Sequence, residues 1–394
     1  MLTDEIDKVF ETQKSYKYEL KKSSYQYRKA KLQAVKKAIL DLQTEIQISM
    51  EKDFGKAYLE SDLTEILPVI SMINQYCKNL KKWMKPTKVK TPLLFFGTKN
   101  YVSYEAKGNC LIISPWNYPF QLALYPVLTA FAAGNTVVLK PSEFTPETNK
   151  IVTKIIKMVF RPEEVTVIEG EVEVSTLLLD KPFDHIFFTG STPVGKIIME
   201  KASKHLASVA LELGGKSPVI IDSRFSIEAA AKNIAWGKFV NSGQTCVAPD
   251  YILLPKGETQ EFVKEFTDAL TNMYPAGFEN NSDFCQIITP KHAKRLKEMI
   301  DTAISEGASL QYGGELFANN KLMPTILSGV NLDMKIMQEE IFGPILPIIE
   351  YDSLESAVSY INDFDNSLAL YVFSNVANNI EYVRENTNSG GLSI

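Results

Sequence analysis

From residue 109 onward, the sequence alternates short apolar runs with amphipathic stretches of helical length. Five runs have the length of buried strands: 110–113, 136–139, 165–168, 185–188 and 219–221. Helical patterns near 121–133, 145–159, 172–180 and 194–204 separate them. Continuously apolar strands joined by helices form parallel sheets that are covered on both faces. We therefore expect a doubly wound α/β domain, in which ligands bind beyond the carboxyl ends of the strands.

A second alternating region follows, over residues 226–394. Helices are expected near 227–240, 258–272, 290–306, 354–362 and 377–386, and strands near 251–254, 345–349 and 369–373. Two long surface helices are also expected before the first strand, over 26–50 and 58–80. The apolar face of the second of these comprises Leu59, Leu63, Ile66, Ile70, Ile73, Cys77 and Leu80. The pattern predicts a second α/β unit, which suits a chain of this length.

Residues 85–103 break the pattern, because prolines and β-forming residues replace helix formers. We expect an extended arm or hairpin that leaves the domain. The apolar run from Leu93 to Phe96 needs cover, either from a partner subunit or from the chain itself.

Charge and cysteine content limit the classes of function. The 394-residue chain has a net charge of −5, which gives no whole-chain reason to expect nucleic acid or a membrane as a partner. Its four cysteines lie far apart, so we expect no metal site, no disulfide framework and a reducing, cytoplasmic location. The polar start of the chain is unlike a secretory signal. The longest apolar stretch, near 122–139, contains Pro126 and Gly134 and predicts a buried helix and strand.

Cys246 lies between a helical stretch and the strand expected at 251–254. Its neighbours are small or polar, so a substrate can approach the sulfur. A thiolate is a strong nucleophile even when it is a minor fraction of the thiol. The alternative is a buried cysteine that packs as a small apolar residue, which is the commoner fate of an intracellular cysteine.

Polar residues follow two strands of the first region. Asn117 follows the strand at 110–113 and can aim an amide N–H at a developing oxyanion; alternatively it is a turn residue between two prolines. Lys140 and Glu143 follow the next strand and can hold the hydroxyls of a ribose; alternatively they form the polar start of a helix.

The turn from Gly190 to Lys196, which includes Ser191 and Gly195, follows the strand at 185–188 and opens a helix. Backbone N–H groups at a helix start suit a phosphate. The turn nearly matches a nucleotide-hydrolase loop, but Ile197 stands where that loop needs a hydroxyl for magnesium. We therefore favour a phosphate contact without nucleotide hydrolysis.

Glu212 lies among apolar and small residues, which predicts a carboxyl group partly shielded from water. Shielding raises the pKa of a carboxyl group toward the range useful for a general base. The alternative is a salt-bridged glutamate at the end of an element. Further along, Glu339, Glu340 and Phe342 place two carboxylates beside an aromatic ring in an expected turn.

Six segments together resemble those of the aldehyde dehydrogenase superfamily, and its class 3 type in particular. They are Pro115–Phe120, Lys140–Glu143, Phe188–Ser191, Leu211–Pro218, Gly243–Tyr251 and Glu339–Pro344. Each alone is weak, but all six occur in the family's order. The resemblance implies a Rossmann-like NAD(P)-binding domain over 1–85 and 104–211, an oligomerisation arm over 86–103, and an α/β catalytic domain over 212–394.

The resemblance also implies the chemistry, which is the NAD(P)-dependent oxidation of medium-chain aliphatic or aromatic aldehydes to carboxylic acids. Cys246 would attack the aldehyde carbon, Asn117 would stabilise the oxyanion, and Glu212 would activate water to release the acid. The cofactor would contact Lys140, Glu143, Gly190, Ser191, Gly195, Glu340 and Phe342. Glu143 disfavours a 2′-phosphate and so favours NAD, although class 3 members often accept NADP as well. The full-length chain would form a homodimer.

The C-terminus departs from the family pattern. The chain stops at residues 388–394, in an expected strand, whereas similar proteins continue through a glycine-rich segment that closes the substrate side and supplies a dimer strand. Two alternatives therefore stand beside the dehydrogenase: a catalytically impaired cofactor-binding remnant, and an acylating enzyme that passes the thioester to coenzyme A. Glu212 favours water as the acceptor, because acylating relatives generally lack that base.

Overall fold

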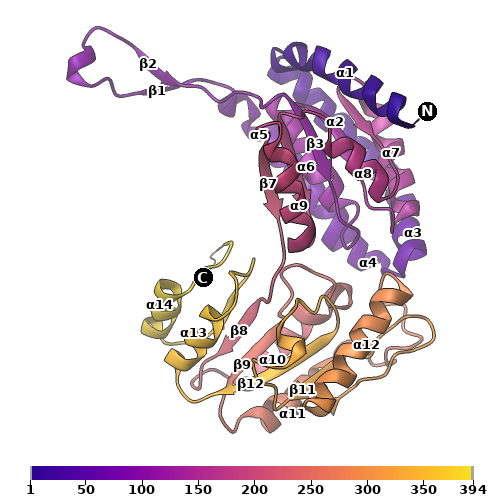
Figure 1. The fold of residues 1–394 in the computed structure, drawn as a ribbon, viewed down its shortest axis with the longest axis vertical. Coiled ribbons are helices and arrows are strands. Elements are labelled where there is room, and N and C mark those ends of the chain that lie inside the picture. Colours follow the sequence, from indigo (N-terminus) through magenta and orange to yellow (C-terminus); the bar gives the residue numbers. More distant parts are fainter. Residues whose placement is uncertain (1, 392–394) are drawn as a thin grey trace. The chain divides into compact units, whose positions relative to one another are not determined.

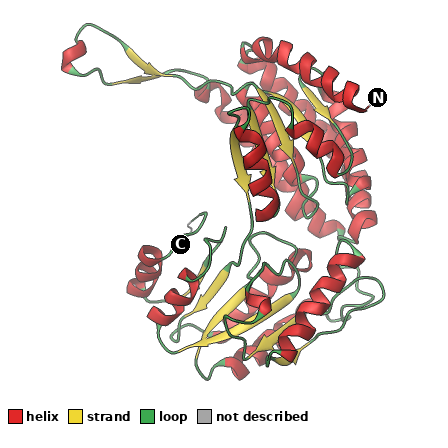
Figure 2. Cartoon of the chain, viewed as in Figure 1, coloured by secondary structure: helices red, strands yellow, loops and turns green. Residues whose placement is uncertain are grey.

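A computed structural model describes residues 2–391. The chain divides into two compact units. Unit 1 comprises residues 1–53 and 58–212, and unit 2 comprises residues 54–57 and 213–394. Both are α/β units, and each is described below by itself (Figure 2).

Unit 1 contains a five-stranded parallel sheet in the order β5-β4-β3-β6-β7. The strands are β3 (Asn109–Ile113), β4 (Thr136–Lys140), β5 (Val165–Val167), β6 (His185–Thr189) and β7 (Ser208–Glu212). Strand β3 pairs with β4 on one side and with β6 on the other. The sheet is therefore doubly wound, as the sequence predicted, and its topological switch point lies between β3 and β6.

The strands differ in two places from those that the apolar pattern predicted, although the catalytic domain expected from the resemblance, 212–394, already includes the second of them. Strand β7 was not expected, because it is a half-buried edge strand whose short apolar run, Val209–Leu211, is bounded by the polar Ser208 and Glu212. The run at 219–221, expected in the first series, belongs to the sheet of unit 2 as β8 (Pro218–Ile221). An apolar run predicts a buried strand but carries no information about which of two sheets it joins.

Helices pack on both faces of the sheet in unit 1 (Figure 1). They are α1 (Leu2–Lys21), α2 (Tyr25–Asp41), α3 (Gln43–Phe54), α6 (Gln121–Ala133), α7 (Pro146–Val159), α8 (Val172–Leu179) and α9 (Thr192–Ser203). The single helix expected over 26–50 is two helices, because the backbone leaves helical geometry at Leu42, where φ is −108° and ψ is 12°.

The helix expected over 58–80 contains a π-helical turn, η1 (Asp62–Ile66), between α4 (Tyr58–Ser61) and α5 (Leu67–Trp83). The wider turn changes which side chains face the core. Leu59 and Leu63, expected on the apolar face, are 70% and 56% exposed, while Glu65 is fully buried. Glu65 accepts hydrogen bonds from the backbone N–H groups of Phe120 and Gln121, at 3.1 and 2.8 Å. A buried carboxylate at the start of α6 is favoured by the positive end of that helix.

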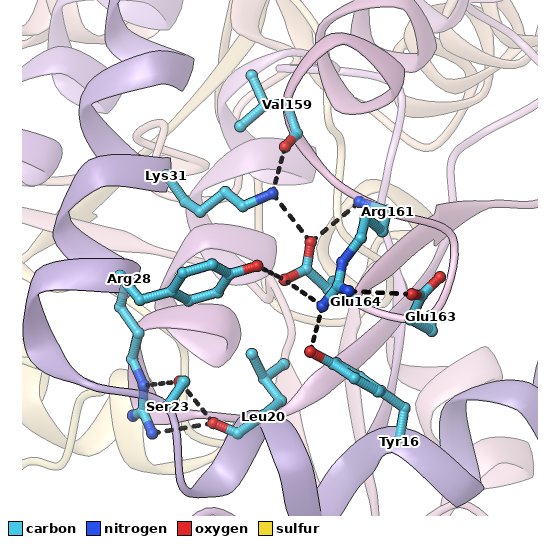
Figure 3. Close-up of polar contacts among 10 residues, drawn as sticks. Tyr16, Leu20, Ser23, Arg28, Lys31, Val159, Arg161, Glu163 and Glu164 are labelled. Carbon is cyan, nitrogen blue, oxygen red and sulfur yellow. Dashed lines mark hydrogen bonds and ion pairs between the residues drawn. The ribbon is translucent and has the colours of Figure 1, made fainter.

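A buried carboxylate, Glu164, ties the N-terminal helices to the turn that precedes β5 (Figure 3). It accepts hydrogen bonds from the Tyr27 hydroxyl, from the Lys31 ammonium at 3.0 Å and from the Arg161 backbone N–H at 3.0 Å. Burial alone would raise the pKa of Glu164, but the hydrogen bonds from Arg161, Tyr27 and Lys31 outweigh burial and hold the pKa below its ordinary value. The carboxylate is therefore ionised and fully paired in the folded protein.

Replacing Glu164 with glutamine is expected to lower the free energy of unfolding by about 3 kcal/mol, because Lys31 then loses a buried ionic partner. The neighbouring Glu163→Gln variant is the matched control. Glu163 forms only a partly exposed pair with Arg161 at 3.4 Å, and its loss should cost less than about 1 kcal/mol. Urea unfolding of the two variants measures the difference, and equal losses would contradict the role assigned to Glu164.

The arm leaves unit 1 as an antiparallel hairpin of β1 (Thr87–Val89) and β2 (Asn100–Val102) (Figures 1 and 2). A short 3-10 turn, η2 (Leu93–Phe95), forms its tip. The side chains of Leu93, Leu94 and Phe96 are 88%, 88% and 90% exposed. The extended arm predicted from the sequence is therefore present, and unit 1 does not itself cover the apolar tip.

Unit 2 contains a six-stranded sheet in the order β10-β11-β12-β9-β8-β13. Besides β8, its strands are β9 (Tyr251–Pro255), β10 (Ser309–Tyr312), β11 (Thr325–Ser328), β12 (Ile345–Tyr351) and β13 (Tyr371–Phe373). Its helices are α10 (Ile227–Phe239), α11 (Thr259–Met273), α12 (Pro290–Ser305), α13 (Leu354–Asn362) and α14 (Ala377–Asn386), all close to the predicted positions. Strands β10 and β11 were not predicted, and β10 is the antiparallel edge strand.

Residues 392–394 of the strand expected at 388–394 lie outside the described residues. Ser389 forms an isolated parallel bridge with Ser367. Within residues 2–391, no helix has the length and hydropathy needed to cross a bilayer.

Candidate active site

Cys246 follows a tight left-handed turn in unit 2. Three consecutive residues have positive φ angles: Asn241 at 56°, Ser242 at 51° and Gly243 at 74°. Residues other than glycine rarely adopt this conformation, which costs about 1–2 kcal/mol for each. Such strain persists only where surrounding contacts enforce it, and it gathers at functional sites. The predicted loop between a helix and strand β9 is therefore a strained and fixed turn.

Buried hydrogen bonds hold this turn. The Ser242 hydroxyl donates to the Cys285 carbonyl at 2.6 Å. The Gln244 amide nitrogen donates to the carbonyls of Asn241 and Gln286 at 3.1 and 3.0 Å, and its amide oxygen accepts from the Ile288 backbone N–H at 3.0 Å. Gln244 is fully buried, so each of these bonds forms away from water. Cys285 is buried beneath the turn.

The Cys246 turn lies directly against the loop that carries Glu340 and Phe342. A Cβ atom on Gly243 would stand 2.4 Å from the Gly343 carbonyl oxygen, so only glycine permits this approach. Phe342 itself has a positive φ of 52°. Two strained loops of unit 2 therefore meet beside the cysteine.

The four cysteines differ in their surroundings. Cys110 and Cys285 are buried, and burial raises the pKa of Cys110 to about 12, while Cys77 has its pKa raised by burial in the α5 interface. Cys246 is partly exposed. The Tyr371 hydroxyl donates to the carbonyl of Val247, the residue after Cys246, at 2.6 Å. Burial and the nearby charge of Cys246 raise the pKa of Tyr371, so this hydroxyl remains a hydrogen-bond donor beside the sulfur.

Buried charges fix the loop of Glu340 in unit 2. Lys216 forms an ion pair with Asp250 and donates to the backbone carbonyls of Ile336 and Glu339 at 3.1 and 3.2 Å. Asp250 also accepts a hydrogen bond from the Ile341 backbone N–H at 3.0 Å. Lys216 and Asp250 lie within two of the family-like segments, but no local pattern indicates their role, because their partner loop is about a hundred residues away.

Glu340 packs against the turn at Gly214, where a Cβ atom would stand 2.1 Å from its carboxylate. Burial and the nearby Asp250 raise the pKa of Glu340 to about 7, although Gly215, Lys216 and Lys238 oppose the shift. Lys238 is buried, and burial lowers its pKa to about 8. This cluster thus contains two groups that titrate close to neutral pH.

Glu340 should make stability fall as the pH rises. Between pH 4.5 and about 7 the folded protein retains a proton that the unfolded chain releases, so the free energy of unfolding decreases across that window. The Glu340→Gln variant removes this titration. Its free energy of unfolding should exceed that of the wild type by up to about 3 kcal/mol at pH 8 and differ little from it near pH 4.5. Urea unfolding at both pH values measures the gap. Glu339→Gln, at the exposed neighbouring residue, is the control, and its difference in unfolding free energy from the wild type should not depend on pH. A difference that stays constant with pH for Glu340→Gln would contradict the prediction.

In unit 1, the predicted cofactor residues gather at the carboxyl edge of the sheet. Lys140 ends β4 and forms a 2.9 Å ion pair with Glu143. Helix α7 begins only at Pro146, so the alternative that Lys140 and Glu143 start a helix is wrong. Asn117 is buried in the loop after β3. At the switch point itself, the buried Ser114 hydroxyl has no hydrogen-bond partner within the described chain, a feature that no sequence motif predicted.

The turn after β6 leads into α9, as predicted. A Cβ atom on Gly190 would stand 2.5 Å from the ring of Phe188, so the backbone there needs glycine. Ser191 is the N-cap residue, but its side chain makes no capping hydrogen bond to α9. Gly195 is buried in the first turn of that helix. Three features here fit a bound phosphate: the Ser114 hydroxyl without a hydrogen-bond partner, the backbone at Gly190 that only glycine permits, and the start of α9 without a side-chain cap.

The shielding expected for Glu212 is not observed. Glu212 is the last residue of the edge strand β7, and its side chain is exposed. The apolar neighbours in the sequence suggested shielding, but side chains alternate between the two faces along a strand, and an edge strand is covered less than an inner one. Unit 1 therefore contains Asn117, Glu212 and the residues that we predict to contact the ribose and the phosphates. Unit 2 brings together Cys246, Glu340 and Phe342.

A sheet with a dinucleotide-type switch point, joined to an α/β unit with a cysteine on a strained turn, defines a cofactor-dependent oxidoreductase. A model of the aldehyde dehydrogenase family matches residues 2–394, and the chain belongs to that family. It is an aldehyde dehydrogenase, an oxidoreductase that acts on aldehydes with NAD(P).

Individual relatives agree in class and fold. The chain is 39% identical to the 4,4′-diaponeurosporen-aldehyde dehydrogenase of Staphylococcus aureus, over 99% of this chain and 84% of that protein. It is 39% identical to rat aldehyde dehydrogenase family 3 member A2, over 93% of this chain and 75% of that protein, which supports the class 3 resemblance. The solved substrate-bound state of Staphylococcus aureus AldH has a TM-score of 0.94 at 39% identity, covering 98% of this chain and 84% of that one. This coverage does not favour an impaired remnant.

Proposed function

We propose that Cys246 is the nucleophile of this aldehyde dehydrogenase. The observation that carries the proposal is the strained turn before Cys246, held by buried hydrogen bonds and ending in a partly exposed thiol. The thiolate attacks the aldehyde carbon and forms a thiohemiacetal. The Asn117 side-chain amide and the Cys246 backbone N–H stabilise its oxyanion, at about 3–4 kcal/mol for each donor. Substrates are medium-chain aliphatic or aromatic aldehydes.

When bound, the cofactor would supply the acceptor for the hydride that leaves the thiohemiacetal carbon, which gives a thioester on Cys246. Lys140 and Glu143 hold the adenosine ribose, and the turn of Gly190, Ser191 and Gly195 contacts the pyrophosphate. Glu340 and Phe342 would hold the nicotinamide ribose and ring. We assign NAD as the preferred cofactor, because the Glu143 carboxylate repels a 2′-phosphate.

Glu212 acts as the general base that activates water, which hydrolyses the thioester on Cys246. The exposed position of its carboxylate supports contact with water. Water is therefore the acyl acceptor, and coenzyme A is the competing acceptor in the alternative acylating enzyme.

The experiment that tests this scheme combines product analysis with the Glu212→Gln variant. The wild type should convert NAD and an aldehyde into NADH and the carboxylic acid. The variant should give one burst of NADH per active site and then turn over about 10²–10⁴-fold more slowly, because the thioester accumulates. Glu173→Gln, on α8, is the control and should behave as the wild type. Acyl-CoA as the product when coenzyme A is added, or an unchanged steady-state rate for Glu212→Gln, would contradict the scheme.

The domain roles follow the same proposal. Residues 1–85 and 104–211 form the cofactor domain, residues 212–394 form the catalytic domain, and residues 86–103 form an oligomerisation arm. The outer edges of β1 and β2 have no strand neighbour in the described sheet, which supports pairing with a second copy in a homodimer. The scattered cysteines support a cytoplasmic location.

A further inference from the structure

The start of helix α6 is capped by a side chain from another element. Phe120, the N-cap residue of α6, makes no side-chain capping bond, so the first backbone N–H groups of the helix need an acceptor from elsewhere. Glu65 supplies it, because one of its carboxylate oxygens accepts the N–H groups of both Phe120 and Gln121, at 3.1 and 2.8 Å. Glu65 and Phe120 are both fully buried, and hydrogen bonds are stronger in such surroundings than in water.

The residues just before this helix start carry Asn117. Residues 114–120 join β3 to α6, and Asn117 and Tyr118 are buried in this loop. The Tyr118 carbonyl accepts the Leu122 N–H at 2.9 Å, which ties the residue after Asn117 to the first turn of α6. A movement of the backbone that Glu65 holds would therefore move Asn117 as well.

Glu65 reaches this position through an irregular helix, the π-helical turn η1. Single π turns inside α-helices occur frequently at functional sites. Burying a carboxylate also costs several kcal/mol of desolvation, which a serine or an aspartate at the N-cap position of α6 would avoid. The chain thus uses an irregular helix and a buried charge where a local cap would satisfy an N–H group. A role in holding the Asn117 loop accounts for both features.

We propose that Glu65 is a positioning residue for Asn117. Its carboxylate fixes the backbone at the start of α6 and so keeps the Asn117 amide N–H aimed at the oxyanion of the thiohemiacetal. A displacement of about 1 Å at such a donor is enough to slow catalysis by about 100-fold. This inference rests on the proposed function, because it needs Asn117 to be an oxyanion donor.

A double-mutant cycle between Glu65 and Asn117 tests the proposal. The measured quantity is kcat/KM for the aldehyde, which includes formation of the thiohemiacetal. Asn117→Ala should lower it by about 100-fold or more, and Glu65→Ala by at least about tenfold. In the Asn117→Ala background, Glu65→Ala should lower it by less than about twofold, since the group that Glu65 positions is already absent. Glu65→Gln keeps the volume of the side chain and should show the same pattern with a smaller loss, so it replaces Glu65→Ala if that variant does not fold.

Asp53 provides the matched control. Its carboxylate accepts the Glu147 and Thr148 N–H groups at the start of α7, at 3.0 and 2.8 Å, so it caps a helix of unit 1 in the same way. Asp53→Ala and Glu65→Ala should lower the melting temperature by comparable amounts. Any change in kcat/KM caused by Asp53→Ala should be the same with and without Asn117. The Kd for NAD, measured by fluorescence, should stay unchanged in the Glu65 variants.

Equal losses of kcat/KM for Glu65→Ala in the two backgrounds would overturn the proposal and leave Glu65 with a structural role only. Glu65 variants with the wild-type rate would overturn it as well, and a slow Asn117→Ala variant would then show that the proposed function still stands. If Asn117→Ala kept the wild-type rate, the oxyanion role of Asn117 and this inference would both fail.

Discussion

Replacing Cys246 with alanine is expected to abolish aldehyde oxidation, lowering kcat by about 10⁴-fold or more, because no other group can form the covalent intermediate. The variant should still bind NAD, since the switch-point residues of unit 1 are untouched. Steady-state kinetics and a fluorescence titration with NAD measure the two properties. A fall in rate without a loss of cofactor binding separates the chemical role of the thiol from a folding role.

The matched control for this variant is Cys77→Ala. Cys77 is partly buried on α5, and its loss should cost about 1 kcal/mol of stability without changing kcat. A thiol reagent should label Cys246 first in the wild type, because Cys110 and Cys285 are buried. Dehydrogenase activity that survives in Cys246→Ala would disprove the assignment of the nucleophile.

The second large effect is expected from a single methyl group on the turn that presents this thiol. Gly243→Ala should lower kcat by about 100-fold or more, because the new Cβ atom must displace the Gly343 carbonyl oxygen, 2.4 Å away, and so shift both loops. The same substitution also forces alanine into a φ of 74°, at a cost of about 1 kcal/mol.

Gly277→Ala separates these two causes. Gly277 has a φ of 76°, but a Cβ atom there would meet nothing within 4 Å. This variant should lose about 1 kcal/mol of stability and keep its kcat, so the ratio of the two kcat values isolates the steric effect. Kinetics and thermal unfolding of both variants provide the comparison. If both glycine variants lost activity equally, the close approach of the Gly243 and Gly343 loops would not be what positions Cys246.

Sequence patterns succeeded where one physical signal dominates. The apolar runs at 110–113, 136–139 and 185–188 match β3, β4 and β6. Strands β3 and β4 are buried throughout and β6 is buried or partly buried along its length, so these inner strands need mainly apolar side chains. Patterns failed where tertiary contacts compete with local preference. The edge strand β7 is only partly buried and its apolar run spans only Val209–Leu211. The π turn at 62–66 buries Glu65 in place of Leu63, because the start of α6 offers that carboxylate two N–H donors.

The sequence by itself determined the doubly wound sheet, the second α/β unit, the arm and the residue types available for chemistry, because burial periodicity and motif order are local properties. Only the tertiary structure decided that Asn241–Gly243 adopt left-handed geometry, and that Lys216 and Asp250 fix the loop of Glu340. It also decided that the side chain of Glu212 is exposed. These features arise from contacts between segments tens to over a hundred residues apart, whose free energies no local pattern records.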